Sequence, residues 1–140
     1  MKKFIIPLAL LITISIFASC DSKEEIFATL HSRVEQQYPG ARITDNDREW
    51  QGIYEVEIYH EGRKKDVCYN RNFKWLYTKW DITILEVPVA ALKSVKDEEP
   101  SWEIDDIEYV ESPGGVYYEF NIENGSRERT IKVNADGVII

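Results

Sequence analysis

A pattern of apolar residues occurs twice along this chain of 140 residues, with an offset of 64 positions between the two copies. In the first copy Tyr54, Val56 and Ile58 alternate with Glu55 and Glu57, which is the period-two alternation of a half-buried strand. The matched positions are Tyr54 with Tyr118, Val56 with Phe120, Ile58 with Ile122, Val67 with Ile131, Asn70 with Asn134, and Asn72 with Asp136. A lone unit of roughly 60 residues buries only about 60% of its unfolded surface and is marginally stable without disulfides or other staples. We therefore expect two tandem units that pack together as one body.

Apolar residues at helical spacing precede the strands of each copy, and a proline closes each helical stretch. These residues are Ile26, Leu30, Val34 and Tyr38 before Pro39, and Val89, Leu92 and Val95 before Pro100. Alternation and turn residues then predict strands near residue 43 and over 53–59, 65–70, 73–80, 103–110, 116–123, 128–134 and 137–140. The predicted fold class is α+β, with tandem units over 26–82 and 83–140. Each unit is expected to be a helix packed on a four-stranded antiparallel β-meander.

The N-terminal segment differs in composition from the rest of the chain. Two lysines precede an uncharged apolar run over 4–17, which is shorter than the roughly 20 residues that span a bilayer. Small residues and then Cys20 follow, so the segment resembles a bacterial lipoprotein signal peptide over 1–19, with a short tether over 20–25. The alternative is an ordinary secretory signal that is cleaved near Ala18.

The lipoprotein resemblance implies a location in the bacterial cell envelope. Cys20 would carry the lipid and hold the protein to the outer-membrane bilayer, since each buried methylene contributes ~0.8 kcal/mol and lipoproteins carry two or three chains. The segment 23–25 resembles the export signals of Bacteroidetes surface lipoproteins. The sequence leaves open whether the protein faces the periplasm or the cell surface.

The charge of the chain excludes one large class of function. The sequence has 25 acidic and 17 basic residues, and removal of residues 1–19 with their two lysines changes the net charge from −8 to −10. Affinity for nucleic acid depends mainly on Lys and Arg side chains that neutralise phosphates. We therefore expect no nucleic-acid partner.

The ionisable residues form no recognisable catalytic or metal-binding motif. His31 and His60 lack the spacing of a zinc site, and the carboxylate runs at 97–99 and 105–106 lack that of a calcium loop. Cys68 lies inside a predicted strand, where a single cysteine is typically a packed residue and not a nucleophile. The sequence predicts no enzyme, no metal and no cofactor.

Segments of both copies carry a resemblance to a known family. They are Tyr38-Pro39-Gly40-Ala41, Tyr54-Glu55-Val56-Glu57-Ile58, Asp66-Val67-Cys68-Tyr69-Asn70, Tyr118-Glu119-Phe120-Asn121-Ile122, and Ile131-Lys132-Val133-Asn134-Ala135-Asp136-Gly137. Together with the secretion signal, they resemble the PepSY-like family of Bacteroidetes, which is described as similar to the β-lactamase-inhibitor protein. The resemblance implies a concave sheet that grips a protein partner, and PepSY modules elsewhere are associated with restraining peptidases. No inhibitory residue of those relatives can be matched to a position in this sequence.

Aromatic residues are concentrated in the segment 73–80. Alternation places Trp75 and Tyr77 on one face of the predicted strand and Trp80 on or near the other. In one interpretation, one set packs under the helix while the other lies at the contact between units. In the second, one set joins Tyr59 of the neighbouring strand in an exposed patch.

The second interpretation gives tentative partner-binding residues, which are Tyr59, Trp75, Tyr77 and Trp80. Tyrosine and tryptophan serve as anchors in protein interfaces because they bury a large area at little cost in rotamer freedom. We predict a non-catalytic envelope lipoprotein that binds a protein or peptide, with enzyme inhibition as one form of such binding. Aromatic rings also stack on sugars, so a glycan-binding surface lipoprotein is the alternative. A purely structural envelope component is a third hypothesis.

Overall fold

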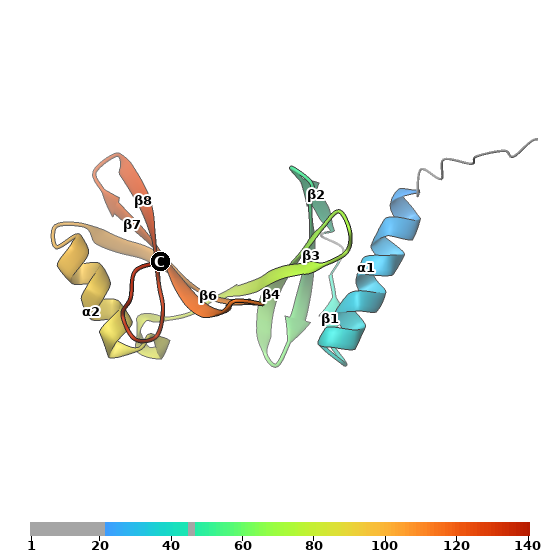
Figure 1. The fold of residues 1–140 in the computed structure, drawn as a ribbon, viewed down its shortest axis with the longest axis horizontal. Coiled ribbons are helices and arrows are strands. Elements are labelled where there is room, and N and C mark those ends of the chain that lie inside the picture. Colours follow the sequence, from blue (N-terminus) through green and yellow to red (C-terminus); the bar gives the residue numbers. More distant parts are fainter. Residues whose placement is uncertain (1–21, 45–46) are drawn as a thin grey trace, which may run out of the picture.

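One continuous antiparallel sheet forms the body of the molecule (Figure 1). The structure, a computed structural model, describes residues 22–44 and 47–140. Its elements are α1 (Lys23–Gln37), β1 (Arg42–Ile43), β2 (Arg48–Trp50), β3 (Ile53–His60), β4 (Arg63–Asn70), β5 (Trp75–Asp81), a 3₁₀ turn (Ile84–Glu86), α2 (Val89–Glu98), β6 (Glu103–Ser112), β7 (Gly115–Asn124) and β8 (Arg127–Val133). The strand order is β1-β3-β4-β5-β6-β7-β8, and β2 also pairs with β3.

The α+β class is confirmed, but the expected pair of four-stranded meanders is not what the strands form. Strand β5 pairs with β6 from Thr78 opposite Glu111 to Asp81 opposite Glu108, which joins both halves of the chain in one sheet. The strand expected over 137–140 is reduced to a single bridge between Val133 and Ile139. Alternation reports which face a residue occupies, whereas pairing across 30 residues of intervening chain is a tertiary contact that alternation does not encode.

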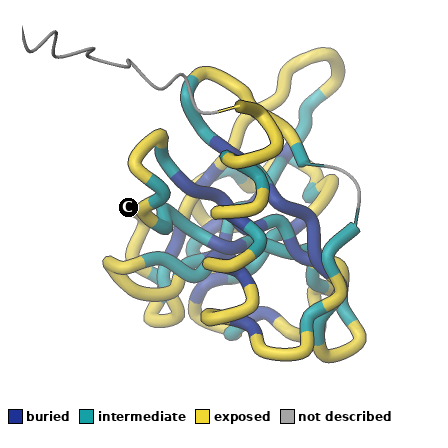
Figure 2. Tube along the Cα trace, turned by 90° about the vertical axis from the view of Figure 1, so that its right-hand side faces the viewer, coloured by how far each residue is buried: buried dark blue, intermediate teal, exposed yellow. Residues whose placement is uncertain are grey.

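Each helix covers its own hydrophobic core at one end of the sheet, and the buried stretches run through the strands while the turns stay exposed (Figure 2). The core under α1 contains Leu30, Val34, Tyr38, Tyr54, Val56, Ile58, Val67 and Tyr69. The core under α2 contains Val87, Ala91, Val95, Ile107, Tyr118, Phe120, Ile122, Ile131 and Val133. Val95 of the apolar stripe expected for the second helix is buried, whereas Val89 is 82% exposed, because α2 turns Ala91 inward in its place.

The two copies of the sequence pattern have matching local geometry. Val56 lies opposite Val67, and Phe120 lies opposite Ile131 at the equivalent position 64 residues later. The following turns also match, because the Asn70 side chain accepts hydrogen bonds from the amides of residues 72 and 74. The Asn134 side chain does the same for the amides of residues 136 and 138. Asparagine is suited to such turns because its side chain bonds to nearby backbone groups.

A buried threonine at the middle of the sheet links the first helix to the strands that join the two halves. Thr78 Oγ1 accepts hydrogen bonds from Tyr38 Oη at 2.7 Å and from Trp75 Nε1 at 2.9 Å. Tyr38 follows directly after α1, and its hydroxyl also lies 3.4 Å from a carboxylate oxygen of Glu111 on β6. Burial raises the pKa of Tyr38, so its hydroxyl stays protonated and remains a donor across the physiological range.

We predict that Thr78→Val lowers the free energy of unfolding by about 2–3 kcal/mol, because the buried Tyr38 hydroxyl and the partly buried Trp75 indole lose their shared acceptor while the volume is kept. Chemical denaturation of the chain from residue 21 onward, which contains every described element, measures this change. Thr29→Val is the matched control, since Thr29 is exposed on α1. An equal effect in both variants would contradict the role of Thr78.

Candidate functional site: the open face of the sheet

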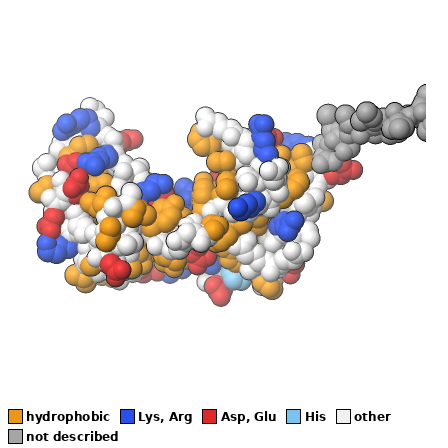
Figure 3. Space-filling view, in the orientation of Figure 1, with side chains coloured by type: hydrophobic (Ala, Val, Ile, Leu, Met, Phe, Trp, Pro, Cys, Tyr) orange, Lys and Arg blue, Asp and Glu red, His pale blue; other side chains and the backbone are white. Residues whose placement is uncertain are grey.

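The two helices lie at the outer ends of the sheet, so the face that they leave uncovered is turned inward between two lobes (Figure 1). The space-filling view shows the molecule hollowed between these lobes along its upper side (Figure 3). We call this uncovered side the open face. Strand registers place on it Arg42, Arg48, Trp50, Ile53, Glu55, Glu57, Tyr59, Lys64, Asp66, Cys68, Tyr77, Lys79, Asp81, Asp106, Glu108, Val110, Tyr117, Glu119, Asn121, Glu123, Glu128, Thr130 and Lys132.

Ion pairs between neighbouring strands cross the open face along its length. They are Arg48 with Glu55 at 2.8 Å, Lys64 with Glu57 at 2.6 Å, Lys79 with Glu108 at 2.8 Å, and Lys132 with Glu119 at 2.9 Å. Burial alone would lower the pKa of Lys79, but its hydrogen bond to Glu108 and the negative charges of Glu108, Glu119 and Asp66 together raise the pKa overall. The hydrogen bond to Glu119 raises the pKa of Lys132 in the same way. These lysines are therefore held charged, and each is committed to a carboxylate of the same face.

A hollow of about 610 Å³ opens on this face where β2 overhangs β3. Its apolar wall consists of Trp50, Ile53 and Tyr77, and charged side chains surround it. Trp50 is 67% exposed although tryptophan is usually largely buried, and it lies directly opposite Ile53 across the turn at Gln51 and Gly52. Both turn residues have positive φ, which gives the tight hairpin that presents Trp50 to the hollow.

Cys68 lies under Tyr77 at the centre of the open face. The two residues are register partners on β4 and β5 and share a hydrogen bond, and Cys68 is buried. Burial raises the pKa of the Cys68 thiol to about 11, and burial also raises the pKa of Tyr77. The thiol is therefore protonated near neutral pH. Cys68 is a buried packing residue, as the sequence predicted.

We expect Cys68 to react with Ellman's reagent at pH 8 at least about 100-fold more slowly in the folded protein than in denaturant, because a pKa near 11 leaves only about one thiol in a thousand ionised. The chain from residue 21 contains no other cysteine, so the released chromophore reports this thiol alone. Tyr77→Ala should speed the reaction by uncovering the sulfur. Similar rates in the folded and unfolded protein would show that the thiol is accessible.

The structure separates the four aromatic residues that the sequence singled out. Tyr59 and Tyr77 lie on the open face, and Tyr59 is 45% exposed with the Arg42 guanidinium over its ring. Trp75 packs against the core under α1, on the opposite side of the sheet. The expectation that Trp75 and Tyr77 share a face is wrong, because a register shift after Cys68 inserts one extra residue between them in β5.

Trp80 also lies on the helix side of the sheet, and neighbours cover both faces of its ring. Its ring centroid is 4.5 Å from that of Tyr109, and the buried ammonium of Lys65 is 4.4 Å from the Trp80 centroid. Trp80 therefore takes no part in the open face. The residue that takes its place is Trp50, which sequence reasoning missed; the signal was a tryptophan beside a Gln-Gly turn in a short polar hairpin.

Within residues 22–44 and 47–140, no group of three or more His, Cys, Asp or Glu side chains is placed to hold a metal ion. His31 contacts Asp47 at 2.6 Å, and the His60 ring packs edge-on against Tyr38, so the two histidines belong to different parts of the structure. No helix in the described part of the chain is both long and apolar enough to cross a membrane. The expected signal peptide and Cys20 lie outside the described residues.

Comparison with solved structures shows the fold. A BLIP-like (β-lactamase-inhibitor-protein-like) protein from Bacteroides fragilis is similar with a TM-score of 0.69 and 21% identity, over 81% of this chain and 82% of the other. A DUF2874 family protein from Bacteroides uniformis gives a TM-score of 0.70 at 18% identity, over 81% and 85% of the two chains. A protein from Bacteroides eggerthii that is described as a candidate periplasmic protein gives 0.69 at 16% identity, over 80% and 84%. No family model and no curated sequence matches the chain. The chain therefore has a BLIP-like fold.

Proposed function

We propose that this protein is a non-catalytic binding protein of the bacterial cell envelope whose open face grips a protein partner. The observation that carries this proposal is a sheet face left uncovered by both helices, with an exposed tryptophan beside a hollow of about 610 Å³. Solvent-exposed tryptophan that lines a concavity is the residue type most enriched among interface anchors. Tyr77 supplies a second aromatic surface in the same hollow.

The rigidity of the open face favours binding over catalysis. Its lysines are fixed in ion pairs, its thiol is protonated, and its residues are carried on paired strands and not on loops. A preformed surface loses less conformational entropy on association than a surface that must be ordered first. The B. fragilis neighbour is named BLIP-like, and we propose inhibition of an enzyme as one consequence of such binding.

We further infer that the chain consists of two tandem PepSY-like units and is anchored as an outer-membrane lipoprotein through Cys20. The matching turns at Asn70 and Asn134 support the tandem units, and the N-terminal sequence supports the anchor. The expected tether over 20–25 is too long, because residues 23–25 already belong to the first turn of α1, which Ser22 caps. An anchor at Cys20 would therefore hold α1 close to the lipid. The description of the B. eggerthii neighbour agrees with an envelope location.

We predict that Trp50→Ala and Tyr77→Ala together reduce retention of the partner from envelope extract at least about 10-fold, because anchor residues carry most of the binding energy. Immobilised protein from residue 21 onward and quantitative mass spectrometry measure the retained proteins. Leu85→Ala is the control, since Leu85 is 92% exposed but lies in the turn before α2. Unchanged retention in the double variant, or binding to envelope polysaccharide in place of protein, would contradict the proposal and favour the glycan hypothesis.

A further inference from the structure

We propose, resting on the proposed function, that the partner of the open face is a folded protein that presents a basic patch together with a protruding apolar side chain. One end of the open face is apolar and the other is acidic. The apolar end would receive the protruding apolar side chain, and the acidic end would receive the basic patch. The hollow at Trp50 and Tyr77 is the apolar end. The strands β6, β7 and β8 form an acidic end, and its charges identify the kind of partner.

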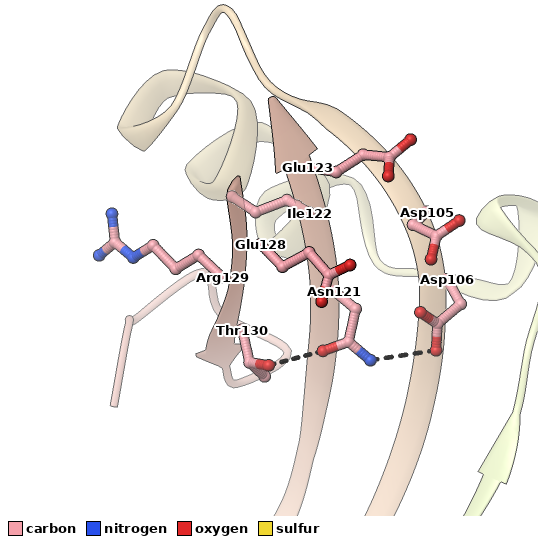
Figure 4. A pocket seen from close by; sticks show the side chains of 8 residues that line it. All are labelled: Asp105, Asp106, Asn121, Ile122, Glu123, Glu128, Arg129 and Thr130. Atoms are coloured by element: carbon pink, nitrogen blue, oxygen red, sulfur yellow. Dashed lines mark hydrogen bonds between the residues drawn. The ribbon is translucent and has the colours of Figure 1, made fainter. Parts of the chain in front are cut away.

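Carboxylates at the acidic end lie opposite one another without cations between them. Glu123 on β7 is the register partner of Glu128 on β8, and both line a hollow of about 330 Å³ together with Asp105 and Asp106 (Figure 4). Like charges directly opposite on neighbouring strands are destabilising. None of these four carboxylates takes part in an ion pair within the described residues.

Arg129 also lines this hollow, but its register partner is Ile122, whose side chain lies on the helix side of the sheet. Arg129 forms ion pairs with Glu99 and, at 3.6 Å, with Glu98, and its guanidinium points away from the carboxylates (Figure 4). Asp106 is held from the opposite direction, because Asn121 donates to it at 3.1 Å and Thr130 donates to Asn121 at 2.6 Å. Asp105, Asp106 and Glu128 are exposed and Glu123 is partly exposed, so the negative charges of the acidic end can be reached from solvent.

The cations elsewhere on the open face do not offset this charge. Arg48, Lys64, Lys79 and Lys132 are each within 2.9 Å of a carboxylate on the same face, so their positive charge is already neutralised locally. A concave surface with excess negative charge attracts basic proteins and raises their association rate by 10-fold or more. A basic partner would also relieve the repulsion between Glu123 and Glu128.

The separation of the two ends favours a folded partner over a short peptide. Thr78 of β5, next to Tyr77, lies opposite Glu111, which lies opposite Val116 of β7. From Val116 to Glu123 the strand advances by roughly 23 Å at ~3.3 Å per residue, and two strand spacings add ~10 Å across, so the ends are roughly 25 Å apart. That span matches the width of a standard interface of ~800 Å² on each partner.

Charge reversal at the acidic end tests the inference. Envelope extract is divided by ion exchange into a basic pool and an acidic pool, and each pool is passed over immobilised protein from residue 21 onward. We expect retention from the basic pool, reduced about 10-fold by Glu123→Lys with Glu128→Lys and reduced further as salt rises. The matched control is Glu24→Lys with Asp136→Lys, which changes the net charge equally at exposed positions away from the open face.

The outcomes separate this inference from the proposed function. Retention from the acidic pool that depends on Trp50 and Tyr77, or equal retention by the reversed and control variants, overturns the basic partner but leaves a binding face. Retention confined to peptides below about 3 kDa overturns the folded partner. Retention from neither pool overturns the proposed function itself.

A measurement without any partner checks the electrostatic premise. Glu123→Gln removes the repulsion with Glu128 and should raise the melting temperature of the free protein by about 1–3 °C while reducing retention from the basic pool. A lower melting temperature would show that the two carboxylates do not repel each other in the free protein. That result would contradict the inference of a basic patch on the partner.

Discussion

The pairing of β5 with β6 is the contact on which the rest of the structure depends. Each half of the chain has its own core under its own helix, and a unit of that size is only marginally stable by itself. Thr78 lies at the start of this pairing and accepts hydrogen bonds from Tyr38 and Trp75, so the end of α1 is tied to the strand that continues the sheet. Because the two sheets become one, their uncovered faces become one open face.

The open face combines features that each conflict with simple stability. Trp50 is left in solvent, Glu123 lies opposite Glu128, and a cysteine is buried beneath Tyr77 where an aliphatic residue would pack as well. On the helix side, Trp80 contacts Tyr109 and the buried Lys65, so its ring is not left in solvent as that of Trp50 is. An exposed tryptophan and opposed like charges are features that proteins typically carry at functional sites, and they are the observations on which the proposed binding role rests.

Much of the fold could be predicted because it depends on local periodicity. The alternation of Tyr54, Val56 and Ile58 correctly placed these residues against a helix, and the repeat placed Phe120 equally well. The candidate site was harder to predict. One inserted residue in β5 moved Trp75 to the opposite face from Tyr77, and no pattern within a single strand announces such a bulge. Trp50 was missed because its importance comes from the pairing of β2 with β3, which places it at a hollow that Tyr77 of β5 also lines.

The sequence by itself determined the α+β class, the helices, most of the strands, the packing role of Cys68 and the acidic balance of the chain, because each follows from residue type and short-range spacing. The tertiary structure decided that the strands form one sheet, which aromatic residues reach the open face, and which carboxylates are paired with cations. Those properties depend on register between strands that are distant in sequence. A shift of one residue reverses the face of every side chain beyond it, so only the paired strands fix the surface that a partner meets.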